Sequence, residues 1–307
     1  METRSFQKCL PKLFMHLRSQ PIEFVLFLCA SLSVVALTLM LLFVVMEGSL
    51  AFTRLGTQLI LGLRWETNSD LYGGFPLIYG SLMVVSGALL IAVPLGVCTS
   101  IFIAEVLPFQ LRDSIKSVLE LLASIPSVIY GFIGVTFLAP LVASIFGLQS
   151  GATALTASLI LAIMTLPTIV GVSGETISAV PSEYKEAAFA LGASKWQTIR
   201  NVVLPLSKSG MLASVMLGFG RAIGETVAVL MVAGNVAMVP TPPWNYLAPV
   251  YPVTAVIAMQ MGEAAVGSLE YSALFGLGLI LFVTTFIVNT IADVIVRRRP
   301  IGRDVQI

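Results

Sequence analysis

Arg221 and Glu225 are the two residues whose types and spacing most directly suggest a chemical role in this 307-residue sequence. They lie four residues apart in an apolar stretch, residues 210–239, that is long enough to cross a membrane. A rise of about 1.5 Å per helical residue puts Arg221 roughly 16 Å deep, near the middle of a hydrocarbon core about 30 Å thick. A charge at that depth costs about 2.5–3.5 kcal/mol or more, so it needs either a partner or a water-filled path.

Two interpretations of these charges are open. In the first, Glu225 lies one helical turn beyond Arg221, and the two form a salt bridge that locks a helix bundle. In the second, Arg221, Glu225 and Thr226 line a path for an anion, because the guanidinium fork suits the oxygens of an oxyanion. Glu225 would then neutralise Arg221 between binding events. Gly220 and Gly224 remove side chains from the same region and would let another helix approach closely.

The elements that hold these residues must be membrane-spanning helices. The chain is 57% hydrophobic and only 11% charged, whereas a soluble domain carries about 25% charged residues. This composition, with a mean hydropathy of +0.96, predicts an all-α integral membrane protein and excludes soluble enzymes and nucleic-acid-binding domains. Apolar stretches long enough to span a bilayer occur at 24–46, 80–103, 118–143, 153–173, 210–239 and 271–296.

The distribution of positive charge predicts how these six spans are oriented. One side of the membrane receives most of the Lys and Arg residues, namely Arg4, Lys8, Lys12, Arg18, Arg112, Lys116, Lys185, Lys195, Arg200, Lys208, Arg297, Arg298, Arg299 and Arg303. The other side has only Arg54 and Arg64. By the positive-inside rule, the N-terminal tail 1–23 and the C-terminal tail 297–307 are cytoplasmic. The outer segments 47–79 and 240–270 are then either connecting loops or a docking surface for an extracytoplasmic partner.

The inner segment between the fourth and fifth spans has clear helix signals. Ser182 is expected to cap a first helix, which ends where Gly192 supplies a left-handed residue. Ser194 and Gln197 form a capping box that starts a second helix, and Pro205 is expected to stop it after Val203. The segment should therefore present two short helices joined by a sharp glycine corner.

The segment contains Glu186-Ala187-Ala188, then Gly192, then Val202-Val203-Leu204-Pro205. This string resembles the EAA loop of ABC-importer permeases, with Val202 where the family usually has Ile. The resemblance implies a type I ABC importer permease (MetI-like) fold with six transmembrane helices and a core over residues 80–296. It also implies that the loop, residues 181–205, couples to a separate ATPase through Glu186, Ala187, Ala188, Gly192, Leu204 and Pro205.

Four further strings run over residues 75–81, 92–96, 123–131 and 221–229. They resemble the phosphate-specific transporter permeases, and the Gly-Glu-Thr string of the last one, followed by a Val-Ala-Val run, resembles their C-type subunit. The resemblance implies a multi-pass protein of a bacterial or archaeal inner membrane. Its implied partners are an A-type permease, a dimer of ATP-binding subunits and an extracytoplasmic phosphate-binding protein. Sulfate, molybdate and phosphonate importers share the EAA architecture, so the anion stays open, as does a homodimer of permeases.

Two rival classes are disfavoured by what the sequence lacks. It contains no Gly-Lys dipeptide and therefore no Walker A loop, so ATP and Mg²⁺ are expected on the partner ATPase and no cofactor or metal on this chain. An intramembrane serine protease needs a base, but the only histidine is His16 in the N-terminal tail. A secondary transporter would show inverted repeats and more spans, and no convincing internal repeat is present.

Overall fold

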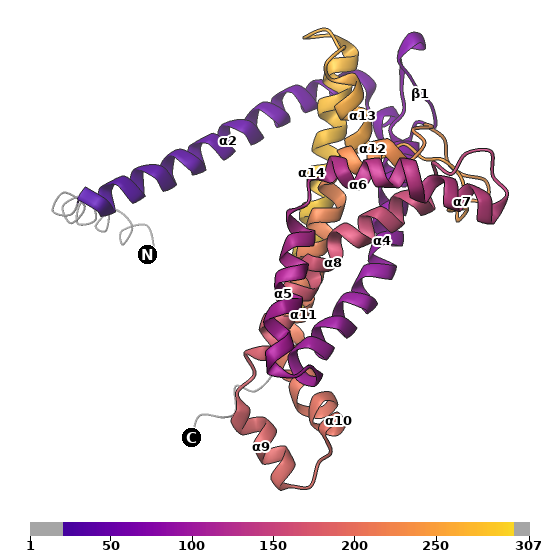
Figure 1. Cartoon of the computed structure of the whole chain (residues 1–307). Coiled ribbons are helices and arrows are strands. Elements are labelled where there is room, and N and C mark those ends of the chain that lie inside the picture. Colours follow the sequence, from indigo (N-terminus) through magenta and orange to yellow (C-terminus); the bar gives the residue numbers. More distant parts are fainter. Residues whose placement is uncertain (1–20, 298–307) are drawn as a thin grey trace.

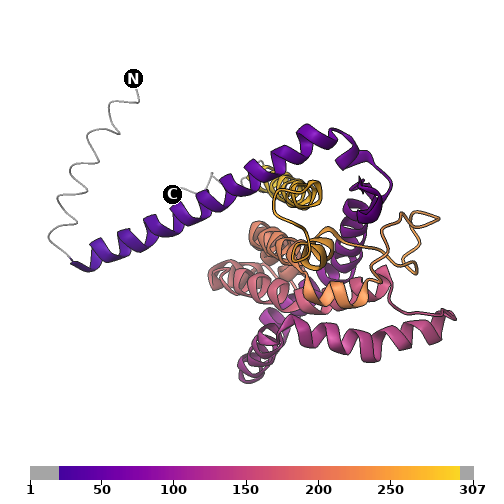
Figure 2. The same ribbon diagram turned by 90° about the horizontal axis from the view of Figure 1, so that it is seen from above.

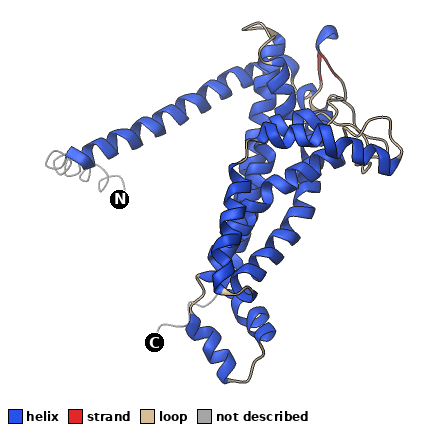
Figure 3. Ribbon diagram, in the orientation of Figure 1, coloured by secondary structure: helices blue, strands red, loops and turns tan. Residues whose placement is uncertain are grey.

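The computed structural model describes residues 21–297, and the predicted cytoplasmic tail residues 1–20 and 298–307 lie outside this range. Within it the chain is mostly helical, with one short hairpin of strands (Figure 3). Six segments are long and apolar enough to cross a membrane, as the composition predicts. They are Phe24–Leu55, Phe75–Val106, Ser127–Phe146, Ala154–Ser178, Lys195–Gly224 and Leu269–Ala292.

The core of the molecule is a close-packed group of three helices, α4 (Phe75–Ile101), α8 (Ala154–Ser178) and α11 (Leu204–Gly224). Small residues allow these helices to approach one another. A Cβ atom on Gly96 of α4 would lie 2.7 Å from Ile169 of α8, and one on Gly218 of α11 would lie 2.9 Å from the same side chain. The three helices therefore form the rigid frame that holds Arg221, which lies on α11.

The first helix, α2 (Pro21–Leu55), leaves this group at a wide angle (Figures 1 and 2). It packs on the last helix, α14 (Leu269–Arg297), near its own C-terminal end, where a Cβ on Gly48 would lie 3.1 Å from the Phe275 carbonyl oxygen. The helix continues past the predicted span, residues 24–46, to Leu55, because Gly48 and the buried Ala51 pack on α14.

A small unit covers the N-terminal end of α4, and this end of the molecule is here called the hairpin end. It comprises α3 (Gln58–Leu61) and the antiparallel strands β1 (Trp65–Glu66) and β2 (Leu71–Tyr72), which are joined by the 3₁₀ turn η1 (Thr67–Ser69). The Trp65 indole N–H donates to Gln260 Oε1 at 2.9 Å, at the end of α13 (Val253–Gln260). The outer segment 240–270 therefore contains one short helix, α13, which this hydrogen bond joins to the hairpin.

The prediction of one span over residues 118–143 is wrong. Helix α5 (Phe109–Ser124) ends before Ile125, whose backbone is extended (φ −64°, ψ 127°) because it precedes Pro126. The chain then turns and forms α6 (Ser127–Ile133), the π-helical turn η3 (Gly134–Leu138) and α7 (Ala139–Phe146), which together lie across the bundle (Figures 1 and 2). Consequently α5 runs beside α8 as a separate helix.

The fifth predicted span, 210–239, is also interrupted. Helix α11 ends at Gly224, the Glu225 backbone is extended (φ −68°, ψ 130°), and the short helix α12 (Val227–Val232) follows. At its other end α11 continues from α10 (Lys195–Thr198) through the π-helical turn η4 (Ile199–Val203). The expected stop at Pro205 is therefore wrong, because this proline lies in the first turn of α11, where its missing N–H breaks no hydrogen bond.

Candidate functional site

Arg221 lies in the last turn of α11, and its side chain reaches α8. It is half-buried, and its Nη1 donates a hydrogen bond of 3.2 Å to Thr168 Oγ1. Thr168 follows Pro167, the proline inside α8. The guanidinium is therefore held against a neutral hydroxyl, which it can release at little electrostatic cost.

The predicted salt bridge between Arg221 and Glu225 is not formed. The helix ends at Gly224, so Glu225 leaves the helical face on which an i,i+4 pair would meet. Its Oε1 instead accepts a hydrogen bond of 3.3 Å from the Ala228 N–H and so caps α12. Among the side chains that the structure describes, the one ion pair joins two other residues, and none of the described carboxylates pairs with Arg221.

Glu225 and Thr226 form the break between α11 and α12. Thr226 Oγ1 donates to the Gly224 carbonyl oxygen at 3.2 Å, and Thr254 Oγ1 donates to the Glu225 carbonyl oxygen at 2.9 Å. Backbone groups freed by the interruption are thus partly satisfied by hydroxyls. Of the site residues predicted from the sequence, Arg221 thus lies in the last turn of α11, whereas Glu225 and Thr226 lie at the break that follows it.

Glycines leave the surface around Arg221 open. A Cβ atom at Gly171, Gly174, Gly220 or Gly224 would have no atom of this chain within 4 Å, apart from each glycine's chain neighbours and its own helix backbone. Two of these glycines lie on α8 and two on α11. The face that carries Arg221 is therefore free for a ligand or for a second chain.

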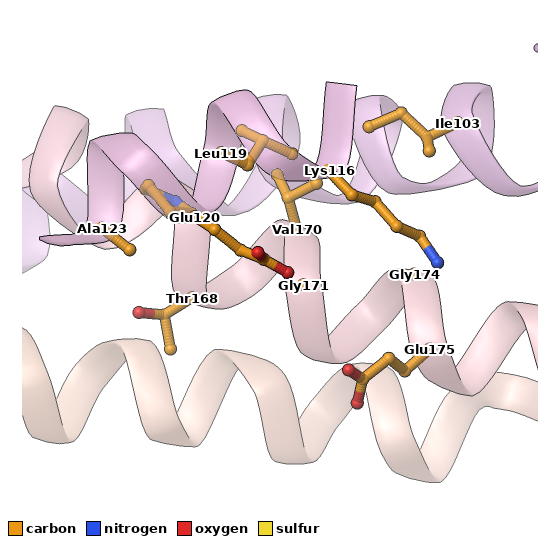
Figure 4. A pocket seen from close by; sticks show the side chains of 11 residues that line it. Ile103, Lys116, Leu119, Glu120, Ala123, Thr168, Val170, Gly171, Gly174 and Glu175 are labelled. Carbon is orange, nitrogen blue, oxygen red and sulfur yellow. The ribbon is translucent and has the colours of Figure 1, made fainter. Parts of the chain in front are cut away.

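A cavity of about 240 Å³ lies on this open side between α5 and α8 (Figure 4). Lys116 and Glu120 extend from α5 toward α8 at Gly174 and Gly171, and Glu175 belongs to α8 itself. Thr168, the hydrogen-bond partner of Arg221, also lines the cavity. Charged groups from two helices therefore line a space that shares one residue, Thr168, with the contact made by Arg221.

Sequence reasoning missed Lys116, Glu120, Thr168 and Glu175. One signal could have found the first two, since Arg112, Lys116 and Glu120 recur every four residues and so share one face of a helix. Placing residues 118–143 in a single span hid this polar face. Thr168 gives no local signal, because its role depends on a contact with a residue 53 positions away.

The predicted two-helix segment is present beyond the far ends of α4, α8 and α11, here called the α9 end (Figure 1). Helix α9 (Ser182–Ala190) is followed by Gly192 with φ +81°, so the predicted left-handed corner is confirmed. The predicted capping box is confirmed too, because the Gln197 N–H donates to Ser194 Oγ and the Ser194 N–H donates to Gln197 Oε1.

The predicted cap at Ser182 is wrong. Pro181 occupies the cap position with an extended backbone, and Ser182 is already helical with no side-chain capping bond. Among the EAA residues, Glu186, Ala187, Gly192 and Pro205 are exposed, whereas Ala188 and Leu204 are half-buried. Large apolar side chains are exposed beside them, with Leu191 at 90% and Trp196 at 61%. An exposed apolar surface of this kind is typical of a protein-binding site.

Comparison with known proteins gives a consistent result. The family model of the binding-protein-dependent transport system inner membrane component matches residues 92–299. A probable ABC transporter permease protein of Bacillus subtilis is 35% identical, over 89% of each chain. The phosphate transport system permease protein PstC of Mesorhizobium japonicum is 39% identical, over 81% of this chain and 80% of the relative.

Solved structures share the fold at low sequence identity. A bacterial ABC transporter involved in alginate import matches with a TM-score of 0.61 at 16% identity, over 94% of this chain and all of that chain. The inward-facing MetNI methionine ABC transporter matches with a TM-score of 0.54 at 16% identity, over 73% and 93% of the two chains. The fold is therefore that of type I ABC importer permeases, as the resemblance of the EAA loop implies.

Proposed function

The chain belongs to the family of binding-protein-dependent transport system inner membrane components, and on that premise we propose that it is the C-type permease subunit of an ATP-driven importer of inorganic phosphate. The observation that carries this proposal is the 39% identity to a phosphate permease over most of both chains. The half-buried Arg221, which no carboxylate of the described residues neutralises, supports an anionic substrate.

In this proposal Arg221 is the anion-binding residue of the path. A phosphate ion entering along the open glycine face would replace Thr168 as the partner of the guanidinium, whose fork matches two phosphate oxygens. Glu225 and Thr226 lie at the helix break beside it, and the Glu225 carboxylate would oppose tight trapping of the anion. The carboxylates of Glu120 and Glu175 would then repel phosphate from the cavity and favour its release.

The coupling residues Glu186, Ala187, Ala188, Gly192, Leu204 and Pro205 would bind the ATPase. Exposed apolar side chains on α9 and α10 support this assignment, because they offer a surface that a partner chain could bury. ATP and Mg²⁺ would bind to the ATPase, so no cofactor is assigned to this chain. Its own contribution is to convert movement of the ATPase into opening and closing of the path.

The complete importer would contain this chain, a related A-type permease, two ATP-binding subunits and an extracytoplasmic phosphate-binding protein. Both termini and the α9 end would face the cytoplasm of a bacterial or archaeal cell, and the hairpin end would face outward. The distribution of Lys and Arg supports this orientation. The binding protein would dock on the outer segments, which include the hairpin and α13.

Reconstituted uptake tests the proposal. The complex purified with its native partners is placed in liposomes, and uptake of labelled phosphate is measured with sulfate or molybdate in competition. We expect ATP-dependent phosphate uptake that excess unlabelled phosphate suppresses and the other anions do not. Suppression by sulfate or molybdate would assign the permease to another oxyanion. Uptake without any ATP-binding subunit would indicate a secondary transporter, and an active complex with two copies of this chain would exclude the heterodimer.

A further inference from the structure

Helix α9 is joined to the transmembrane helices by an ion pair that its sequence does not reveal. Lys185 Nζ lies 2.6 Å from Glu105 Oε1, although the two residues are 80 positions apart. No residue of α9 is buried. Among the side chains that the structure describes, this is the only ion pair, and the only side-chain hydrogen bond that joins α9 to another element.

The acidic partner, Glu105, lies at the junction of two helices. Glu105 belongs to the π-helical turn η2 (Phe102–Val106), which connects the end of α4 to α5. Such turns have irregular hydrogen bonding and are frequent at functional sites. The side chain of Glu105 is only 10% exposed, and the neighbouring Ala104 belongs to an apolar cluster with Ile177 and Val180. A carboxylate in this position requires a partner, so it should follow Lys185 when α9 moves.

The same turn is connected to the charged cavity. Ile103 of η2 lines the cavity, and α5, which begins three residues after Val106, contributes Lys116 and Glu120. A displacement of η2 would therefore change the position of α5 against α8. Since Thr168 of α8 also lines the cavity and binds Arg221, the proposed anion-binding residue lies at the end of the same series of contacts.

We propose that the Lys185–Glu105 ion pair transmits movement of the ATPase-binding helix α9 to η2 and α5, and so couples ATP hydrolysis to opening of the charged cavity. This inference rests on the proposed function. Lys185 and Glu105 are positioning residues, because neither lines the cavity or touches the path. Their ion pair joins the exposed helix α9 to η2, and η2 leads into α5, which forms one wall of the cavity.

The test compares variants in the reconstituted complex by the phosphate imported per ATP hydrolysed. Lys185→Gln, Glu105→Gln and the double variant with both changes are expected to lower this ratio by about fivefold, at the lower end of usual coupling between sites. The double variant leaves no unpaired charge, so its defect reports the lost link and not the burial of a lone carboxylate. The charge-swapped pair Lys185→Glu with Glu105→Lys should restore the ratio.

Matched controls come from charged residues of the same region. Lys208→Gln on α11 and Asp113→Asn on α5 change exposed side chains that have no ion pair in the described part of the chain, and they should leave the ratio unchanged. If Lys185→Gln, Glu105→Gln and the double variant also match the wild type in this ratio, the inference is overturned. If Lys185→Gln alone fails to assemble, the double variant decides by the same ratio.

A second measurement separates this inference from the proposed function. Hydrogen exchange of the backbone amides in residues 182–190 is measured on the purified full-length chain, without any ATPase. We expect exchange to rise in Lys185→Gln and in the double variant, and to return in the charge-swapped pair. If exchange is unchanged in these variants, the ion pair does not hold α9 and the inference is overturned. A wild-type complex without ATP-driven uptake would instead overturn the proposed function, and the exchange data would still decide whether Lys185 holds α9.

Discussion

At the scale of single residues, Arg221 shows why a buried charge must be interpreted from its neighbours. Its spacing to Glu225 suggests an intrahelical pair, yet the helix ends between them and Arg221 binds Thr168 on another helix. A guanidinium held by a neutral hydroxyl keeps its full charge for an incoming anion. This arrangement favours the path interpretation over the structural salt bridge, and substitution can separate the two.

We predict that Arg221→Gln abolishes phosphate uptake while the complex still assembles and hydrolyses ATP, because the amide lacks the charge and the fork that hold phosphate. Thr168→Val, which removes only the hydroxyl, should weaken uptake less, and Thr290→Val on the exposed end of α14 is its matched control. Uptake of labelled phosphate and ATPase activity are measured together. Normal phosphate uptake by Arg221→Gln would contradict the path interpretation, and failure of this variant to assemble would assign Arg221 a structural role.

At the scale of elements, glycine has a different role at the corner after α9 than on the open face formed by Gly171, Gly174, Gly220 and Gly224. Gly192 has φ +81° and a Cβ atom there would meet nothing within 4 Å, so only backbone conformation opposes a side chain. Gly220 has an ordinary helical backbone and equally open surroundings in this chain. Substitutions at the two positions should therefore fail for different reasons.

At the corner, Gly192→Val should cost about 1 kcal/mol or more in local stability, because a β-branched residue opposes the left-handed conformation. We expect normal membrane insertion but impaired ATP-driven uptake. Gly192→Asn is the matched variant, since Asn tolerates positive φ, and it should retain most of the uptake. Normal uptake by Gly192→Val would argue against a coupling role for this segment.

On the open face, Gly220→Leu should leave the thermal stability of the purified chain unchanged or slightly raised, since glycine is about 1 kcal/mol worse than a good helix former. Phosphate uptake should be lost, because the new side chain fills the space beside Arg221. Ala36→Leu enlarges an exposed side chain on helix α2, away from this site; it is the control and should transport normally. Failure of Gly220→Leu to assemble with the partner permease would assign the face to helix packing, and normal uptake would exclude it from the path.

At the scale of the whole molecule, the two ends of the bundle differ in what they expose. The α9 end presents Leu191, and the hairpin end presents Val266, which is 86% exposed between α13 and α14 (Figure 1). The proposed orientation requires the first to face the cytoplasm and the second to face outward. The importer assignment depends on this orientation, because the ATPase is supplied from the cytoplasm.

In a chain whose native cysteines are replaced by alanine, Leu191→Cys should react with a membrane-impermeant maleimide only in inverted vesicles. Val266→Cys should react only in intact cells or spheroplasts. Cells that lack the ATP-binding subunit are used, so that no partner covers Leu191. The reverse labelling pattern would put α9 outside the cell, and the proposed coupling to an ATPase could not hold.

Local signals in the sequence were sufficient for much of this architecture. Six apolar stretches indicate six spans because burial in lipid requires a long uninterrupted run of apolar residues. The corner at Gly192 and the cap at Ser194 follow from conformational and hydrogen-bonding preferences of neighbouring residues. The family resemblance could also be identified from the sequence, because the EAA string is one continuous segment.

Only the tertiary structure decided which partners the charged residues have. Arg221 binds Thr168, Lys185 binds Glu105, and Lys116 faces α8, and each contact joins helices distant in sequence. Such contacts depend on which helix faces meet, and those faces are set by the break at Ile125 and the end of α11 at Gly224. Hydropathy shows how apolar a segment is but not where its helix ends or turns. The cavity between α5 and α8 and the Lys185–Glu105 ion pair could therefore be identified only from the tertiary structure.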